Sequence, residues 1–576
     1  MHDLVIRSGR LTDGSGAPAF EGDLAVDGDR ITAVGTVEGR GRREIDADGL
    51  LVTPGWVDVH THYDGQVTWD PDVTPSGWHG VTTVVVGNCG VGFAPVRPAE
   101  RDWVIQLMEG VEDIPGAALA EGMTWNWQSF PEYLDEVDRM ARVLDVAAMV
   151  PHGALRAFVL GADRSNAEAG DEEVALMAKL TAEAIDAGAV GVSTTRTLAH
   201  MAKDGQPAAG TFAAARELVA IGEALGGAGR RVFSVVTDSL LGSRGEQEFA
   251  WMAEISKRSR IPVTYMVIDV PFTPGGWRQA LARGLEHNRE GAWLVPQVAG
   301  KPASLMIGWE STYHLFSGHE TYQPLAGLPL AERVARLRDP EVRRAMLAEP
   351  LAFRNVFVGL LHSQLTNGNL FQLGEPADYE PSRDTSVAAR AAATGVSPVE
   401  LAYDLMLERD GRELLYAPVL GYTEGDMHAL RELLVHPSTV LGLGDGGAHV
   451  GFICDGSLPT FMLTHWVRDR RRGEPLALEH AVHLQTDRTA RLFGFRDRGR
   501  LAPGYLADIN VIDFDNLTLP PVEMAYDLPA GGKRLVQGVR GYKATVKRGV
   551  VVREDDAFTG ERPGTLLRGP QAAPGE

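Results

Sequence analysis

The stretch Val52–Asp64, VTPGWVDVHTHYD, decides how the rest of the sequence is interpreted. Pro54 and Gly55 interrupt the chain, and the apolar run after them predicts a buried strand that ends in two histidines, His60 and His62. Side chains at positions i and i+2 of a strand point to the same side, so both imidazoles can face one point and chelate a metal. The alternative is a pair of ordinary surface histidines beside a turn, and the remaining sequence has to decide between the two.

The composition limits the class of protein. The chain has 576 residues, too many for one small core, which predicts two or more structural units. Its 55 basic and 77 acidic residues give a net charge of −22, which argues against binding to nucleic acid or to an anionic membrane surface. The net charge says nothing for or against a small anionic substrate, which needs only a local cation.

The two cysteines, Cys89 and Cys454, exclude a disulfide scaffold and fit a reducing compartment. The first ten residues, MHDLVIRSGR, lack the apolar core of a signal peptide. No apolar run approaches the roughly 20 residues that a membrane span needs. We therefore expect a cytoplasmic protein.

Both ends of the chain have the residue pattern of antiparallel β-strands joined by tight turns. Short Val, Ile and Leu runs separated by Asp-Gly and Ser-Gly pairs fill residues 1–54, and similar runs return at 507–515 and 542–555. This pattern predicts one small β-sandwich built from residues 1–54 and 499–576. The last residues, from about Pro563, have the composition of a frayed end.

The middle, residues 55–498, alternates near-continuous apolar strands with amphipathic helices such as 172–188, 214–229 and 246–259. Such alternation predicts a parallel sheet covered on both faces, and eight strands point to a (β/α)8 TIM-like barrel. The predicted strands are 55–62, 81–88, 145–152, 189–196, 230–238, 261–269, 293–300 and 439–447.

Two insertions lengthen this pattern, a Trp-rich one at 95–140 and a long one at 301–436 with helices of its own. Loops after barrel strands lie over the catalytic face, so such insertions are typical of substrate walls or lids. Contacts within a homo-oligomer are the alternative, and the sequence leaves the oligomeric state open.

The carboxyl ends of parallel barrel strands meet at one mouth, so the side chains there test the interpretation of His60 and His62. Metal-capable and charged residues recur at these ends, which a random surface would not arrange. This recurrence favours a metal site over surface histidines. In strand order the residues are His60 and His62; Cys89; His152 and Arg156; Arg196 and His200; Asp238; Asp269; Gln297; and Asp445 and His449.

Cys89 has two possible roles. A buried free cysteine is usually an inert small hydrophobe. However, Cys89 stands between Gly87 and Gly90 at a strand end, in a chain with only one other cysteine, which favours a thiolate ligand. Two imidazoles, one thiolate and one carboxylate make a plausible set of Zn²⁺ ligands. Cys454 is assigned no role.

Several separated motifs resemble one known family. The segments PGWVDVHTHYD, DLVIRSGRLTDGSG and GRLAPGYLADINVID (499–513) resemble the amidohydrolase superfamily. The combination of HTHYDGQ, VVVGNCGVGFAPV and GDGGAH is most similar to its N-acyl-D-amino-acid deacylase branch, which is D-aminoacylase-like. The resemblance covers nearly the whole chain and implies a metal-bearing (β/α)8 barrel with a β-sandwich formed from both chain ends.

When the family's motifs are matched to this sequence, the resemblance implies that the metal ligands are His60, His62, Cys89 and Asp445. It implies that Asp445 is both a ligand and the general base. The implied reaction is hydrolysis of an amide by water activated at the metal, with Asp445 taking the proton and returning it to the leaving amine.

The sequence departs from the family at its fifth and sixth strands, which end in FSVVTDS and TYMVID and lack the histidines found there. We therefore expect one zinc ion, with Asp238, Asp269 or His200 as candidates for a second metal. The arginine that follows the family's fifth-strand histidine is also missing, which leaves Arg156 and Arg196 as candidates to hold a substrate carboxylate.

Two further histidines have open roles. His449 is expected to orient Asp445 or to touch the substrate, and His152 fits a supporting position as well as a site position. The predicted activity is hydrolysis of an N-acyl amino acid or a similar small amide. A cyclic amide, a lactone or a secondary metabolite is the alternative substrate. A non-catalytic scaffold is disfavoured, because the chain keeps both first-strand histidines and Asp445.

Overall fold

The computed structural model describes residues 1–226, 231–238, 240–350 and 356–576. Its centre is a sheet of eight parallel strands in the order β16-β12-β11-β10-β9-β8-β7-β6. The eight predicted strands are confirmed, although each is shorter than predicted, and Arg230, where the fifth was expected to begin, lies outside the described residues. The strands are β6 (Trp56–Asp58), β7 (Val81–Val86), β8 (Asp145–Pro151), β9 (Gly191–Thr195), β10 (Val232–Val236), β11 (Val263–Met266), β12 (Leu294–Ala299) and β16 (Val440–Gly442).

The barrel closes between the segments that follow its first and last strands. Thr61 and Gly446 form a parallel bridge. The amide of His62 donates to the Gly446 carbonyl at 2.8 Å, and the amide of Asp445 donates to the His60 carbonyl at 3.0 Å. Closure therefore brings residues that are almost 400 positions apart in sequence side by side at the mouth.

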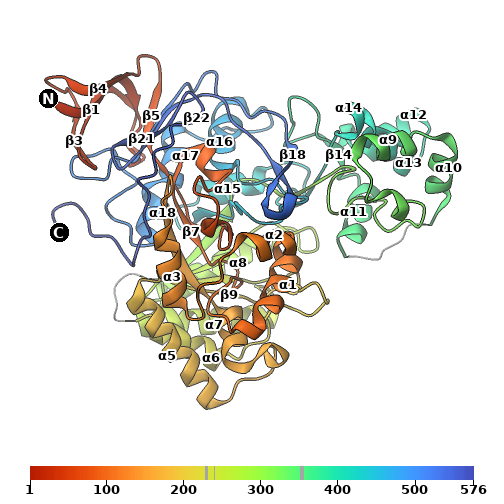
Figure 1. The fold of residues 1–576 in the computed structure, drawn as a ribbon, viewed down its shortest axis with the longest axis horizontal. Helices are drawn as coiled ribbons and strands as arrows, with labels where there is room; N and C mark the ends of the chain where they lie inside the picture. The colour runs from red at the N-terminus through yellow and green to blue at the C-terminus, as the bar shows by residue number, and fades with distance from the viewer. Residues whose placement is uncertain (227–230, 239, 351–355) are drawn as a thin grey trace.

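Helices cover the outside of the barrel (Figure 1). The three helices predicted from amphipathic spacing are present in the described residues, whereas residues 227–229 of the prediction 214–229 lie outside them. Helix α5 buries Val174, Met177, Thr181, Ala184 and Ile185 along one face, as a period of 3.6 requires. None of the helices in the described part of the chain is long and apolar enough to cross a membrane. The barrel-side helices are α4 (His152–Leu160), α5 (Asp171–Ala187), α6 (Ala215–Ala224), α7 (Gly242–Ser259), α8 (Gly276–Arg289), α15 (His428–Val435), α16 (Leu458–Phe461), α17 (Leu478–Gln485) and α18 (Asp487–Leu492), with a π-helix at Met462–Asp469.

The two chain ends join in one nine-stranded sheet, as the recurrence of β-texture predicts. The junction is the antiparallel pairing of β5 (Leu51–Pro54) with β17 (Ile509–Ile512). Both ends contribute to one apolar core, in which Ile6 and Val26 pack with Ile509 and Val546. The other strands are β1 (His2–Leu11), β2 (Phe20–Asp27), β3 (Arg30–Gly35), β4 (Gly41–Asp46), β20 (Tyr542–Lys547), β21 (Val550–Glu554) and β22 (Ala557–Phe558).

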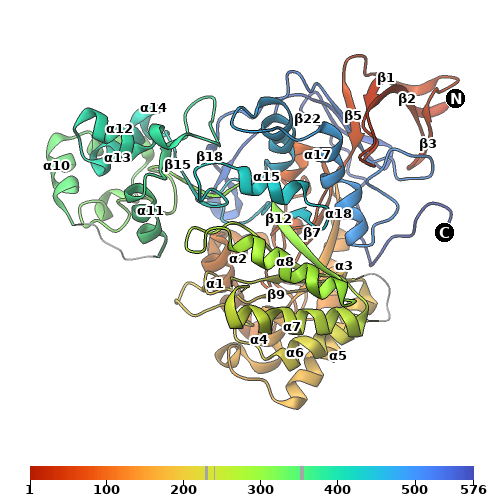
Figure 2. The same cartoon turned by 180° about the vertical axis from the view of Figure 1, so that it is seen from behind.

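The two insertions differ in how they pack. The first forms α1 (Arg101–Glu112), α2 (Gly116–Gly122) and α3 (Phe130–Arg139), whose apolar side chains join the main core. Much of the second forms a lobe with its own core, which projects from the barrel on the side away from the N-terminal strands (Figures 1 and 2). This lobe contains the sheet β13 (Ala303–Ile307), β15 (Leu415–Leu420) and β14 (Phe371–Gln372), and the helices α9 (Leu330–Leu337), α10 (Pro340–Ala348), α11 (Val356–Thr366), α12 (Val387–Thr394), α13 (Pro398–Met406) and α14 (Glu408–Gly411).

The C-terminal tail is not the frayed end that its composition suggests. Leu566 and Leu567 are buried, and the Leu567 amide donates to the Val146 carbonyl at 2.7 Å. Leu567 packs with Phe495 among the apolar side chains at the base of the barrel. The prediction was wrong because composition does not register an apolar surface elsewhere in the chain that two leucines can cover.

A buried ionic network joins the base of the barrel to the sheet, and we call Asp145, Arg498, Lys547 and Asp508 the base cluster. The Asp145 carboxylate lies 2.6 Å from the Arg498 guanidinium and 2.9 Å from the Lys547 ammonium, which is 2.7 Å from Asp508. Although burial alone would raise it, Lys547 and Arg498 hold the pKa of Asp145 well below its usual range.

Candidate metal centre

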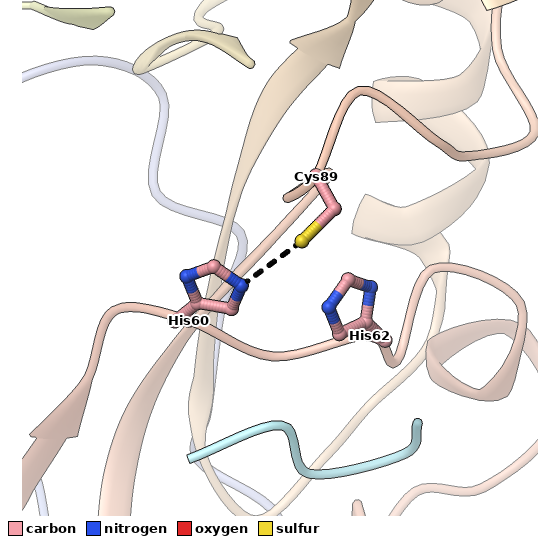
Figure 3. A group of neighbouring side chains, drawn as sticks. All are labelled: His60, His62 and Cys89. Atoms are coloured by element: carbon pink, nitrogen blue, oxygen red, sulfur yellow. Dashed lines mark hydrogen bonds between the residues drawn. The ribbon is translucent and has the colours of Figure 1, made fainter. Parts of the chain in front are cut away.

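His60, His62 and Cys89 converge at the mouth of the barrel. The Nε2 atom of His60 lies 3.2 Å from the Cys89 sulfur, and one potential ligand atom from each residue lies within 4.8 Å of the other two. Figure 3 shows the two rings and the thiol directed at a common point. All three side chains are buried.

Asp445 completes this group from the last strand. Its Oδ1 atom lies 3.5 Å from His60 Nε2 and 3.8 Å from His62 Nε2. A quarter of the Asp445 side chain is exposed, whereas the side chains of both histidines are almost fully buried. Asp445 is thus the most exposed of the four side chains.

The loop after β7 places Cys89 through a tight turn. Gly87 and Cys89 both have positive φ, of 81° and 55°. A Cβ atom on Gly87 would lie 2.1 Å from the Met149 carbonyl oxygen, so only glycine fits there. The Asn88 side chain donates to the Thr61 carbonyl at 3.2 Å and fastens the turn to the segment that carries both histidines.

Gln297, at the seventh strand, supports His60. Its Oε1 atom lies 2.7 Å from His60 Nδ1. With Nδ1 directed at this amide oxygen, the Nε2 atom is left to face Cys89 and Asp445. Sequence reasoning placed Gln297 at the mouth and did not assign this supporting contact.

Sequence reasoning missed Glu112, the last residue of α1. Its Oε1 atom lies 3.2 Å from His62 Nδ1 and its Oε2 atom 3.6 Å from His449 Nε2. The contact with His62 is close, but its angle lies outside hydrogen-bond geometry. Glu112 follows Val104 and Met108 at intervals of four and so lies on the buried face of the helix, which is the signal that could have revealed it.

Burial disfavours the charged forms of the titratable groups at the mouth. Burial raises the pKa of the Cys89 thiol well above its usual value, and the neighbouring Glu112 and Asp445 add to the effect. Burial, with Asp455 and Asp58 nearby, raises the pKa of Asp445 to about 8. Burial also lowers the pKa of His60 to about 4, which keeps its imidazole neutral.

A divalent cation fits these residues. It would favour the thiolate and the carboxylate that burial alone disfavours, and it needs neutral imidazoles. Several buried polar atoms around the cluster lack a hydrogen-bond partner, including Asp64 Oδ2 and Gln297 Nε2. Nitrogen, sulfur and carboxylate oxygen form a donor set typical of Zn²⁺.

The structure does not bring His152 and Arg156 into the cluster. The His152 nitrogens face Thr194 Oγ1 at 2.8 Å and Glu217 Oε1 at 2.7 Å, which leaves no nitrogen free for a metal. Arg156 pairs with the same Glu217 and donates to the Ser165 carbonyl at 2.8 Å. Both are held in a buried polar network behind the mouth.

The remaining candidates lie around the cluster without joining it. Arg196 pairs with Glu248 at 2.8 Å, and the Asp238 carboxylate accepts from Thr197 at 2.8 Å. The Nδ1 atom of His200 lies 3.0 Å from Thr195 Oγ1, at the end of β9. Among the described residues, the one group of three or more potential ligands contains none of His200, Asp238 and Asp269.

One buried lysine lies shortly after a barrel strand. Lys301 comes two residues after β12, is buried, and lies 2.9 Å from Asp455. Its ammonium also lies 4.6 Å from the centre of the Tyr379 ring. These contacts make Lys301 the counter-ion of Asp455.

A family model and two relatives match this chain over most of its length. A family model described as "Amidohydrolase family" matches residues 43–553. The chain is 27% identical to a D-aminoacylase of Alcaligenes xylosoxydans xylosoxydans over 574 residues, covering 98% of this chain and 97% of the relative. It is also 27% identical to an N-acyl-D-aspartate deacylase of the same organism, covering 99% of this chain and 96% of the relative.

A solved structure supports the fold. The N-acyl-D-glutamate deacylase of Bordetella bronchiseptica, complexed with zinc and a phosphonate inhibitor, superposes with a TM-score of 0.64 at 23% identity. The match covers 98% of this chain and 99% of the other. The (β/α)8 barrel and its flanking sheet are therefore shared with that protein.

Proposed function

The chain belongs to the amidohydrolase family, and on that premise we propose that it is a metal-dependent hydrolase. It cleaves the carbon–nitrogen bond of an N-acyl amino acid or a similar small amide. The observation that carries this proposal is the convergence of His60, His62, Cys89 and Asp445 at the mouth of the barrel. The names of the two relatives support an acyl-amine substrate.

We propose Zn²⁺ as the metal, in one site held by His60, His62, Cys89 and Asp445. The donor set and the zinc named for the Bordetella bronchiseptica structure both support this choice. When bound, the metal would polarise the scissile carbonyl and lower the pKa of the attacking water. His200, Asp238 and Asp269 are the residues to examine if a second metal is found.

Asp445 is the proposed general base. It is the partly exposed member of the cluster and so can contact both water and substrate. It takes a proton from the attacking water and returns it to the amide nitrogen as the carbon–nitrogen bond breaks. Gln297 holds the His60 ring during this exchange, and the buried walls around His60 and Cys89 exclude bulk water.

A second candidate substrate is an amide or lactone without a free carboxylate, including a cyclic amide. The observation in its favour is that both arginines expected to bind a carboxylate are already paired, Arg156 with Glu217 and Arg196 with Glu248. A paired guanidinium away from solvent is a poor site for a further anion, because its movement toward that anion would leave the glutamate without its ion-pair partner.

The proposed location is the cytoplasm. Both cysteines are free and buried, which suits a reducing compartment.

Elemental analysis combined with a substrate panel tests the proposal. We expect about one zinc ion per chain, loss of activity on chelation, and recovery with Zn²⁺. The panel contains N-acyl-D-amino acids, their L-enantiomers and cyclic amides, and it separates the two substrate candidates. His60→Asn should abolish activity, whereas the control His428→Asn, at an exposed histidine, should retain it. Full activity in the metal-free protein would contradict the proposal.

A further inference from the structure

We propose that Glu112 is a positioning residue of the metal centre, which fixes the His62 ring so that its Nε2 atom faces the metal. This inference rests on the proposed function. It assigns a role in the metal site to the insertion at 95–140, for which the sequence suggested a substrate wall, a lid or an oligomer contact.

The geometry of His62 carries the argument. Its Nδ1 atom lies 3.2 Å from Glu112 Oε1, whereas its Nε2 atom faces Asp445. Both His62 and Glu112 are almost fully buried, so the side chains have few alternative arrangements. An imidazole that gives Nε2 to a metal carries its proton on Nδ1 and needs an acceptor there. The distance between His62 Nδ1 and Glu112 Oε1 already lies within the range of such a hydrogen bond.

The two ligand histidines are supported differently. His60 has the neutral amide oxygen of Gln297 at 2.7 Å from its Nδ1 atom, whereas His62 has a carboxylate. A carboxylate acceptor makes the imidazole a stronger donor to the metal than an amide does. Glu112 would therefore strengthen the His62 bond to the metal as well as orient the ring.

The end of α1 also connects the first and last strands of the barrel. Asp113, next to Glu112, has a φ of 51° and accepts a hydrogen bond from the Gly451 amide at 3.1 Å. The second oxygen of Glu112 lies 3.6 Å from His449 Nε2. This one helix end thus contacts His62 and the loop that begins with Asp445.

An ordinary packing role does not account for Glu112. Glu112 Oε2 is buried and has no hydrogen-bond partner, which is unfavourable, and an apolar residue would fill the same space beside Val104 and Met108 without burying a polar atom. A carboxyl group at this position is explained if it accepts the proton on His62 Nδ1.

The test is a comparison of zinc affinity and cobalt spectra in Glu112→Gln and Glu112→Ala. Zinc affinity is measured by competition with a chromogenic chelator, and Co²⁺ substitution reports the geometry of the site through its visible spectrum. We expect Glu112→Ala to bind zinc about 10- to 100-fold more weakly, with an altered Co²⁺ spectrum. Glu112→Gln should lie in between, because its amide can accept a hydrogen bond as Gln297 does.

The matched control is Glu109→Gln, on the same helix, where the carboxylate pairs with Lys203 at the surface. It should bind zinc as the wild type does. Circular dichroism checks that each variant is folded, and if Glu112→Ala does not fold, the nearly isosteric Glu112→Gln decides. Wild-type zinc affinity and an unchanged Co²⁺ spectrum in folded Glu112 variants would overturn the inference. A wild-type protein that binds no metal would instead overturn the proposed function itself.

Discussion

Two buried polar clusters lie at opposite ends of the same barrel, and they are built in opposite ways. At the base, the carboxylates of Asp145 and Asp508 are matched by the cations of Arg498 and Lys547 at 2.6 to 2.9 Å. At the mouth, Asp445, Glu112 and Cys89 gather around two neutral imidazoles.

The pKa values of the carboxyl groups differ between the base cluster and the mouth. The base holds the pKa of Asp145 below its usual range, whereas burial at the mouth raises the pKa of Asp445 to about 8. A balanced cluster stabilises the fold without any ligand. The mouth has an excess of groups that become anionic, which is the arrangement expected where a cation is to be bound. Within one barrel, the base cluster therefore serves stability, and the cluster at the mouth serves the proposed cation binding.

The largest expected effect is on catalysis at the mouth. Asp445→Asn removes the proposed general base and should lower kcat by about 10²- to 10⁴-fold, since proton transfer by a positioned group contributes that much. Steady-state kinetics on the best substrate of the panel measures it, with metal content determined in parallel. Asp469→Asn, at an exposed carboxylate, should leave kcat unchanged. Wild-type turnover by Asp445→Asn would remove Asp445 from the mechanism.

The next effect concerns stability at the base. Lys547→Met leaves Asp508 without its buried partner and should lower the free energy of unfolding by about 3–5 kcal/mol. Denaturant titration measures the loss. Lys543→Met is the matched control on the same strand, because Lys543 forms an exposed pair with Asp555 and should cost at most about 1 kcal/mol. Equal stability of the two variants would show that the base cluster has no structural role.

A smaller effect, on zinc affinity, is expected when the hydrogen-bond partner of His60 is removed. Gln297→Leu removes the acceptor for His60 Nδ1 and should weaken zinc binding by about 10-fold, at the low end of the range for such supporting contacts. Chelator competition measures the change, and Gln206→Leu at an exposed position provides the control. An unchanged zinc affinity would mean that packing alone orients the ring.

The smallest effect is a loss of stability at acidic pH, which should be absent at neutral pH. The folded-state pKa of Asp145 lies below its ordinary value, and contacts with His152 and Arg156 lower that of Glu217 to about 2 against the opposing effect of burial. Carboxylates of this kind stabilise the fold above their unfolded pKa and lose that contribution as pH falls. The free energy of unfolding should therefore decline below about pH 4.5, by at most about 1.4 kcal/mol per group and pH unit.

Lys547→Met provides the check on this assignment. Removing the ammonium raises the pKa of Asp145, so the acid-induced decline should begin at a higher pH than in the wild type. An identical pH profile in both proteins would assign the decline to other groups.

Local patterns predicted the strands but not the partners of their end residues. The alternation of strands and helices gave all eight barrel strands, and the shared β-texture gave the joined chain ends. Arg156 and Arg196 were candidates because they follow strands, yet each is paired with a glutamate from a helix more than 50 residues away. The sequence predicts that a residue lies at a strand end, whereas tertiary packing decides which group its side chain contacts.

The sequence by itself determined the barrel and the ligand candidates of the site. A period of two makes His60 and His62 face one point, and the glycines around Cys89 form the turn that places its thiol beside them. Only the tertiary structure decided that Asp445 closes on these residues and that Glu112 stands behind His62. The physical reason is that barrel closure and the docking of α1 depend on contacts between distant segments, which no local period encodes.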